Sequence, residues 1–145
     1  MHLRRGDYGF GKFYRAPCQW FENWLEQSGI KPDDFVIYLC SDEPQAYRDR
    51  FTAKGFSVFC HLDFEFMAEL KPFLDFYIIT VADQCAVSES TYSIFACMLN
   101  DNAKAFYKSD IAAKGLTSFD PWNCKVFESD SALSPEEHQI LVKLD

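Results

Sequence analysis

The chain has 145 residues and a formal net charge of −8, from 14 basic and 22 acidic side chains. So acidic a balance disfavours general nucleic-acid binding, which requires a basic face. Aromatic residues make up 17% of the chain and charged residues 25%, which predicts a folded protein with a ring-rich core and not a disordered one. We expect residues 1–145 to form one domain.

The sequence also bears on where the protein is expected to work. It contains no apolar run long enough to span a membrane, and its first residues lack the apolar stretch of a signal peptide. None of the six cysteines belongs to a C-x-x-C pair, and most have apolar neighbours. We therefore expect free buried thiols and a cytoplasmic location, in preference to a disulfide framework, and no metal site.

In the first half of the chain the pattern predicts alternating helices and strands. A helix is expected over residues 17–29, where apolar side chains fall on one stripe between a proline and a glycine. The apolar run at 35–39 lacks alternation, which is typical of a strand buried on both faces. A second helix is expected over 42–55, and a short strand at 57–60.

The second half continues this alternation. Apolar residues recur at spacings of three and four between 66 and 81, which predicts one long helix or two, with Pro72 as a kink or a fresh start. A strand at 85–88 leads into another helix, and a last helix begins near Ser134, while residues 115–130 carry no clear pattern. The whole series predicts an α/β fold with a Rossmann-like parallel sheet flanked by helices.

Sheets of this kind bind ligands at the carboxyl ends of their strands, where loops lead into helices. The first polar cluster at such an end includes Arg4, Arg5 and Asp7. A guanidinium fork matches two phosphate oxygens, so the pair of arginines forms a plausible anion clamp that Asp7 could orient. A solvated basic segment explains the same residues equally well.

The other clusters follow later strands. Ser41 and Asp42 fit helix capping best, although Asp42 could also meet a ligand hydroxyl or hold the arginines. The third cluster is rich in hydroxyls at a predicted helix start, which suits a phosphate group. Capping accounts for one hydroxyl but not for the whole set, which comprises Ser88, Ser90, Thr91 and Ser93.

In this order, His-Leu-Arg-Arg-Gly-Asp-Tyr at 2–8, Tyr-Leu-Cys-Ser-Asp-Glu-Pro at 38–44 and Ser-Thr-Tyr-Ser at 90–93 resemble three motifs of the fucosyltransferase superfamily. That group includes alpha-1,2-linking, alpha-1,6-linking and protein O-fucosyltransferases. Its members have a GT-B-type fold, and their carboxyl-terminal Rossmann-like domain binds GDP-fucose. The resemblance covers residues 2 to about 100, and it implies a donor-binding domain without the amino-terminal acceptor domain.

The resemblance also implies roles for individual residues. Arg4 would contact the β-phosphate and stabilise the departing GDP, and Asp7 would support it in catalysis. Guanine would be held by His2 and by the carboxylate of Asp75, which suits the adjacent N–H donors of that base. The remaining phosphate contacts would come from Arg5, Ser90, Thr91, Tyr92 and Ser93, with Ser41 and Asp42 as supporting residues.

By the same resemblance the reaction would be inverting and independent of a metal or other cofactor, with GDP-fucose as donor and a glycan or a protein as acceptor. Glu89 departs from the pattern, because many bacterial members have Asn there and a carboxylate beside a diphosphate is repulsive. Two alternatives therefore stay open: a noncatalytic GDP-binding module, and a protein-interaction module that binds no nucleotide. A homo-oligomer is also open at this point.

Overall fold

A five-stranded sheet forms the centre of the protein, whose computed structural model describes residues 1–64, 69–127 and 133–145. Its spatial order is β3 (Cys40–Ser41), β1 (His2–Leu3), β5 (Gln84–Val87), β6 (Ala105–Asp110) and β7 (Gly115–Ser118). The pairings from β3 to β6 are parallel, and β7 pairs with β6 in antiparallel register. A second parallel pair joins β2 (Val36–Tyr38) to β4 (Ser57–Phe59). The predicted Rossmann-like α/β fold is confirmed.

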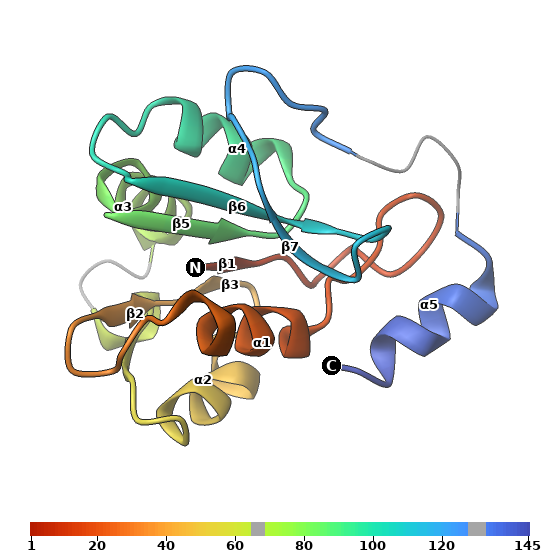
Figure 1. Cartoon of the computed structure of the whole chain (residues 1–145), viewed down its shortest axis with the longest axis horizontal. Coiled ribbons are helices and arrows are strands. Elements are labelled where there is room, and N and C mark those ends of the chain that lie inside the picture. Colours follow the sequence, from red (N-terminus) through yellow and green to blue (C-terminus); the bar gives the residue numbers. More distant parts are fainter. Residues whose placement is uncertain (65–68, 128–132) are drawn as a thin grey trace.

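Helices cover both faces of the sheet (Figure 1). On one side lie α1 (Cys18–Ser28) and α2 (Pro44–Thr52), and on the other lie α3 (Lys71–Val81) and α4 (Thr91–Met98). A short 3-10 turn, η1, spans His61–Asp63. Each face has its own apolar core, which explains why both sides of the central strands are apolar. No helix among the described residues is long and apolar enough to cross a membrane.

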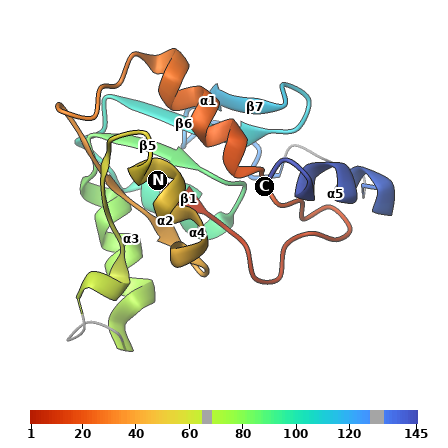
Figure 2. The ribbon, with the colours of Figure 1, turned by 90° about the horizontal axis from the view of Figure 1, so that it is seen from below.

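The last helix, α5 (Pro135–Val142), lies beside the loop that follows β1, as Figures 1 and 2 show. The Gly11 carbonyl accepts a hydrogen bond from the Leu133 N–H at 2.9 Å and lies 3.0 Å from Nε2 of His138. The expected start of this helix is confirmed, because Ser134 and Glu137 cap each other's main-chain N–H groups. The end of the chain thus holds the loop that carries Arg4 and its neighbours.

Most predicted helices are found, with differences at their starts. Helix α1 ends at Gly29, whose φ of 72° is the left-handed conformation that glycine adopts at low cost. Helix α2 begins at Pro44, because the Asp42 carboxylate is engaged by the loop after β1 and does not cap it. Pro72 marks a fresh start in α3, while the part of that prediction at 65–68 lies outside the described residues.

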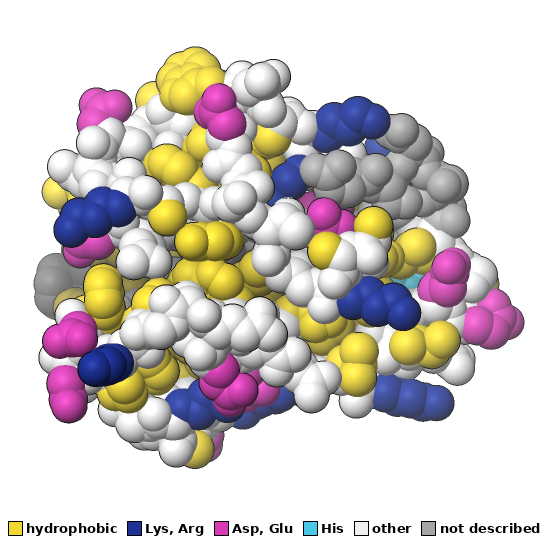
Figure 3. All heavy atoms as spheres, viewed as in Figure 1, with side chains coloured by type: hydrophobic (Ala, Val, Ile, Leu, Met, Phe, Trp, Pro, Cys, Tyr) yellow, Lys and Arg dark blue, Asp and Glu magenta, His cyan; other side chains and the backbone are white. Residues whose placement is uncertain are grey.

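The strand expected at 35–39 is divided, and it is not buried on both faces. Leu39 separates β2 from β3, and its N–H donates to the Phe59 carbonyl at 2.7 Å. Val36 is 67% exposed, because β1 is too short to reach it and no strand among the described residues lies between β2 and β5. An apolar cavity of about 470 Å³ occupies this place, and Figure 3 shows apolar side chains gathered over the strands on that face.

The cysteines agree with the prediction of free thiols. None of the six is joined in a disulfide among the described residues, and all but Cys124 are buried. Burial raises the pKa of the Cys18 thiol to about 12, which keeps it protonated at physiological pH. The five buried cysteine side chains therefore serve as small apolar residues of the two cores.

Candidate functional site

Three strands end at the same edge of the sheet and bring the predicted clusters together. Because β1 lies between β3 and β5, the residues that follow these strands become neighbours. The Arg4 N–H donates to Oγ of Ser88 at 3.1 Å, and the Arg5 N–H donates to Oδ1 of Asp42 at 2.9 Å. The convergence predicted from the sequence is therefore found, with the main chain after β1 tied to both neighbouring loops.

A pocket of about 570 Å³ opens at this edge. The first turns of α3 and α4 and the loop after β1 close its sides. The predicted site residues that line it are His2, Arg4, Asp7, Ser41, Asp42, Asp75, Ser90, Thr91 and Tyr92. Residues far apart in the sequence thus share one concave site of the size typical of small-molecule pockets.

Arg4 stands between two carboxylates in this pocket. Its Nη2 donates to Oδ1 of Asp7 at 2.7 Å, and its Nη1 lies 3.4 Å from Oδ2 of Asp42. The guanidinium carbon also lies 5.8 Å from the centre of the Tyr8 ring. The Arg4 side chain is 38% exposed and that of Asp7 is 68% exposed, so their ion pair is worth little in water. An anion can therefore replace Asp7 at this guanidinium at small cost.

The start of α4 provides polar groups beside Arg4. Ser90 is the N-cap residue, in an extended conformation, and its side chain lies near the Tyr8 hydroxyl. Burial raises the pKa of Tyr8, and Ser90 lowers it against that effect. Thr91 is exposed at the first helical position. The N-terminus of a helix presents N–H groups and a partial positive charge, so this corner of the pocket favours an anionic group.

Asp75 gives the opposite end of the pocket a buried carboxyl group. This residue is 5% exposed, and its Oδ1 accepts a hydrogen bond from the Tyr38 hydroxyl at 3.0 Å. Burial raises the pKa of Asp75 to about 6, although the hydrogen bond from Tyr38 and the charge of Lys71 both lower it. The carboxyl group is therefore largely ionised at pH 7 and can accept hydrogen bonds.

His2 lies at the same end of the pocket and is 6% exposed. Burial lowers the pKa of His2 to about 3, with help from the charges of the amino terminus and Arg4. Its ring is therefore neutral, and its centre lies 5.7 Å from that of the Tyr92 ring. The His2 Nδ1 is buried without a hydrogen-bond partner among the described residues. Such an atom is costly unless a ligand or a water molecule satisfies it.

Arg5 does not take the phosphate-binding position expected of it. Its side chain is fully buried on the far side of the loop and stacks 4.4 Å from the centre of the Tyr47 ring. Its Nη1 donates to the Ala16 carbonyl at 2.9 Å, and its Nη2 donates to Oδ1 of Asp145 at 2.8 Å. Adjacent residues leaving a strand point to opposite sides, which is why only one of the two arginines reaches the pocket.

Ser93 also lies away from the pocket. It is fully buried, and its Oγ donates to the Ser88 and Ser90 carbonyls at 3.3 and 3.2 Å. The Ser88 hydroxyl is used in the same way, because it donates to the His2 carbonyl at 3.2 Å. Half of the hydroxyl cluster therefore holds the turn between β5 and α4, and only Ser90 and Thr91 face the pocket.

The structure also bears on three residues whose roles the sequence left open: Ser41, Asp42 and Glu89. Oγ of Ser41 accepts a hydrogen bond from the Glu43 N–H at 3.1 Å, so this residue caps the turn before α2. Asp42 does not cap the helix. It holds the loop that carries the arginines, which is one of the roles considered for it from the sequence. Glu89 is buried and does not line the pocket, and its N–H donates to Oγ of Ser109 at 3.1 Å. Its carboxylate is therefore not among the groups that a ligand would meet.

Several lining residues were not predicted from the sequence to belong to the site. Lys71 and Pro72 come from the start of α3, and the Pro72 carbonyl accepts a hydrogen bond from the Tyr92 hydroxyl. The others are aromatic, and most of them come from the glycine-rich loop after β1. Aromatic side chains between glycines in an otherwise polar loop are the signal that could have found them: Tyr8, Phe10, Phe13 and, from further along the chain, Phe127.

No group of three or more His, Cys, Asp or Glu side chains in the described ranges is arranged to hold a metal ion. Comparisons of the chain with protein-family models, with curated proteins and with solved structures give no match. The fold and the pocket together define an α/β protein with a concave pocket at the carboxyl ends of its parallel strands, where sheets of this kind bind ligands.

Proposed function

We propose that this pocket binds a GDP-sugar and that the chain is the donor-binding domain of an inverting, metal-independent, fucosyltransferase-like glycosyltransferase. The observation that carries the proposal is the convergence of His2, Arg4, Asp75 and Ser90 on one pocket, from separate strands and helices. The sequence motifs quoted above supply the reaction class, and the geometry supplies a site with the right chemical groups.

The phosphates are assigned to the middle of the pocket. Arg4 is the cation there, and Ser90 and Thr91 add hydroxyls at the start of α4. When a sugar–phosphate bond breaks, negative charge accumulates on the diphosphate, and a fixed guanidinium aimed at it lowers the barrier. Asp42 keeps Arg4 in place through the loop, while the exposed Asp7 yields its contact and becomes free to act nearer the sugar.

Guanine is assigned to the end that contains His2 and Asp75. The Asp75 carboxylate faces the pocket with one oxygen already bonded by Tyr38, so a purine amide N–H has a preoriented acceptor. The buried and unpartnered Nδ1 of His2 gives a second reason for a polar ligand edge at this place. Adenine offers a ring acceptor where guanine offers an N–H donor, so a carboxylate discriminates between them.

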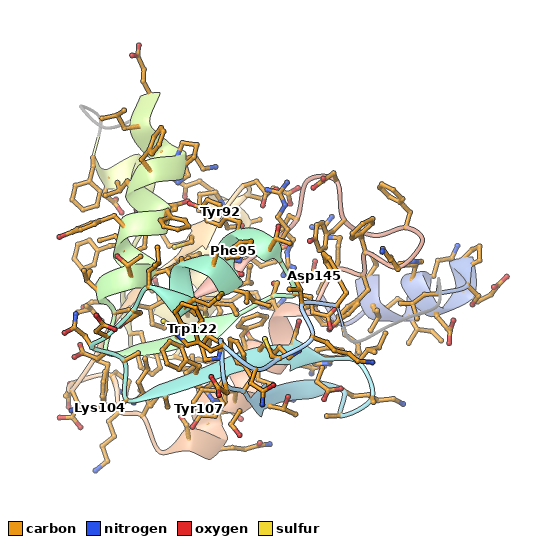
Figure 4. The ribbon with its side chains drawn as sticks, turned by 90° about the horizontal axis from the view of Figure 1, so that it is seen from above. Tyr92, Phe95, Lys104, Tyr107, Trp122 and Asp145 are labelled. Atoms are coloured by element: carbon orange, nitrogen blue, oxygen red, sulfur yellow. The ribbon has the colours of Figure 1, made fainter. Side chains whose placement is uncertain are left out.

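Separate calorimetric titrations with GDP and with two control nucleotides of the same charge, ADP and UDP, test the binding step. We expect selective GDP binding that Arg4→Ala weakens by at least tenfold. Lys104→Ala is the matched control, because this exposed cation lies at the far end of β6 from Tyr92 of the pocket (Figure 4). Equal binding of all three nucleotides, or an Arg4→Ala variant that binds GDP normally, would contradict the proposal.

A noncatalytic GDP-binding module is the second candidate, and one observation favours it. The carboxylate of Asp7, the acid assigned to catalysis, is paired with Arg4 at 2.7 Å, so it is not poised as a base in this structure. Incubation with GDP-fucose, an acceptor-binding part and a glycan or protein acceptor separates the candidates, because a transferase moves the fucosyl group from the diphosphate to an acceptor hydroxyl and releases GDP. A module without activity would bind the donor and leave it intact.

A further inference from the structure

An aromatic cluster lies at the end of the pocket away from Asp75. It consists of Tyr8, Phe10, Phe13 and Phe127, all of which line the pocket. The Tyr8 and Phe13 ring centres are 5.5 Å apart, and those of Phe13 and Phe127 are 5.4 Å apart in an edge-to-face arrangement. Phe10 adds a ring that is 62% exposed. The other three rings are half-buried, and partly exposed rings gathered in a concave site indicate a ligand surface more than a folding requirement.

The loop that carries three of these rings, Tyr8, Phe10 and Phe13, is held by its own main chain. The Gly9 N–H donates to the Phe13 carbonyl at 2.6 Å, and the Phe13 N–H donates to the Phe10 carbonyl at 3.1 Å. The Tyr8 N–H donates to the Arg5 carbonyl at 2.7 Å, which anchors the loop at its start. The carbonyl of Gly11 anchors its tip to the segment before α5. The rings are therefore presented by a fixed turn, which lowers the entropic cost of binding.

Two cations lie against the rings. The Arg4 guanidinium faces Tyr8, and Nζ of Lys12 lies 5.6 Å from the centre of Phe13 and 5.5 Å from that of Phe127. Arg4 is thus shared between the cluster and the middle of the pocket. On its other side, the charge of Arg4 acts on His2, whose ring lies beside Tyr92. These contacts run from a polar end around His2 and Asp75, through a guanidinium, to an apolar end of aromatic rings.

This order matches the order of chemical groups in a nucleoside diphosphate sugar. The base has a hydrogen-bonding edge that suits a carboxylate and an imidazole. The sugar has an apolar face of C–H groups that suits aromatic rings, with hydroxyls around its rim. A nucleobase also stacks on rings, but within the cluster only Tyr8 carries a polar side-chain atom, and the three phenylalanine rings have none to read a base edge.

We propose that Tyr8, Phe10, Phe13 and Phe127 form the sugar subsite and hold the C–H face of the donor hexose against the loop after β1. This assignment rests on the proposed binding of a GDP-sugar. Stacking there would place the bond between sugar and phosphate next to Arg4, with Asp7 alongside. The rings would then fix which face of the sugar is open to an incoming acceptor.

The test compares GDP with GDP-fucose and GDP-mannose in calorimetric titrations of the wild-type chain and Phe10→Ser. We expect the variant to bind both GDP-sugars about fivefold to tenfold more weakly, since a stacked ring contributes on the order of 1 kcal/mol, and to change GDP affinity less than twofold. Phe95→Ser is the control, because Phe95 is 56% exposed on α4 and does not line the pocket (Figure 4). Unchanged thermal unfolding of both variants confirms that the fold is kept.

The possible failures are distinct. If GDP binds the wild type but Phe10→Ser weakens GDP and GDP-sugars equally, the rings serve the nucleotide and the sugar assignment is wrong. The same conclusion follows if Phe10→Ser changes neither affinity. If no guanine nucleotide binds the wild type, the proposed function fails, and this assignment fails with it. Upfield shifts of the sugar proton resonances on binding, reduced in Phe10→Ser, provide an independent sign of stacking.

Discussion

Gly6 and Asp42 approach so closely that no side chain fits between them. A Cβ atom built on Gly6 would lie 2.4 Å from Oδ2 of Asp42, the oxygen that faces Arg4. Gly6 also has a φ of 32°, a conformation that residues with a side chain rarely adopt. The glycine of the motif at 2–8 thus allows the Asp42 carboxylate to reach both arginines.

We expect Gly6→Ala to destabilise the protein by about 2–3 kcal/mol, because the strained φ and the displacement of Asp42 act together. Urea unfolding measures the change. Gly11→Ala is the control, since Gly11 has a φ of 58° but has nothing within 4 Å of an added Cβ. The free energy of unfolding of Gly11→Ala should fall by only about 1 kcal/mol. Equal losses in the two variants would show that the contact with Asp42 is unimportant.

Substitutions of the two adjacent arginines should have different effects: Arg5 is needed for stability, and Arg4 for ligand binding. Arg5→Met leaves the Asp145 carboxylate, which is 10% exposed, without the guanidinium that it meets at 2.8 Å. We expect a loss of about 3 kcal/mol in the free energy of unfolding, at the low end for removing one partner of a buried ion pair, because Arg15 still lies 3.5 Å from Oδ2 of Asp145. Arg4→Ala should lose less than about 1 kcal/mol, because its ion pairs are partly exposed.

Hydrogen exchange localises the effect of Arg5. The Asp145 side chain also accepts hydrogen bonds from the Cys18 N–H and the Tyr47 hydroxyl, so it fastens the end of the chain to α1 and α2. Amides of α5 should therefore exchange faster in Arg5→Met than in the wild type. An Arg5→Met protein with wild-type exchange in α5 would contradict this role.

These contrasts show what the sequence could and could not reveal. The helix stop at Gly29 and the helix start at Ser134 depend on local chemistry, so they were predicted correctly. The edge of the sheet that carries the site followed from the order of strands and loops. Which of Arg4 and Arg5 faces the pocket depends on the direction of side chains after a two-residue strand, which composition does not determine.

The features that the sequence did not predict depend on tertiary contacts. In β6 the polar residues Lys108 and Ser109 are buried, since Tyr14 donates to Ser109 at 3.1 Å and Lys108 donates to the Lys125 carbonyl at 2.6 Å. No apolar alternation therefore marks this strand. In α3 the reverse holds: Phe73 is 74% exposed, so the apolar spacing at 66–81 overstates burial. Partners that are distant in sequence produce both differences.

The buried pair of His2 and Asp75 should give opposing pH dependences of stability. The folded protein raises the pKa of Asp75 from 3.8 to about 6, so between these values the folded state binds more protons and acidification is stabilising. It lowers the pKa of His2 from 6.5 to about 3, so in that range the unfolded state binds more protons and acidification is destabilising. Each contributes at most about 1.4 kcal/mol per pH unit.

Single variants should therefore change the slope of the free energy of unfolding against pH, and in opposite directions. The effect is expected between pH 6 and pH 4, the range set by these pKa shifts. Relative to the wild type, Asp75→Asn should lose stability more steeply on acidification, and His2→Gln should lose it less steeply. Urea unfolding at a series of pH values measures both, and groups that the variants share cancel in the comparison. Parallel slopes in all three proteins would rule out the assigned shifts.

The hydrogen bond from Tyr38 to Asp75 should set the pH range of nucleotide binding. Guanine N–H groups need an ionised acceptor, so GDP affinity should fall by up to tenfold per pH unit below the pKa of Asp75, which is about 6. Because the Tyr38 hydroxyl lowers that pKa, Tyr38→Phe should move the midpoint to higher pH. The nucleotide phosphate also titrates near pH 6, but equally in every variant. Tyr77→Phe, on the exposed side of α3, should keep the wild-type midpoint. Titrations from pH 5 to pH 8 that give one midpoint for all three proteins would remove Asp75 from the guanine site.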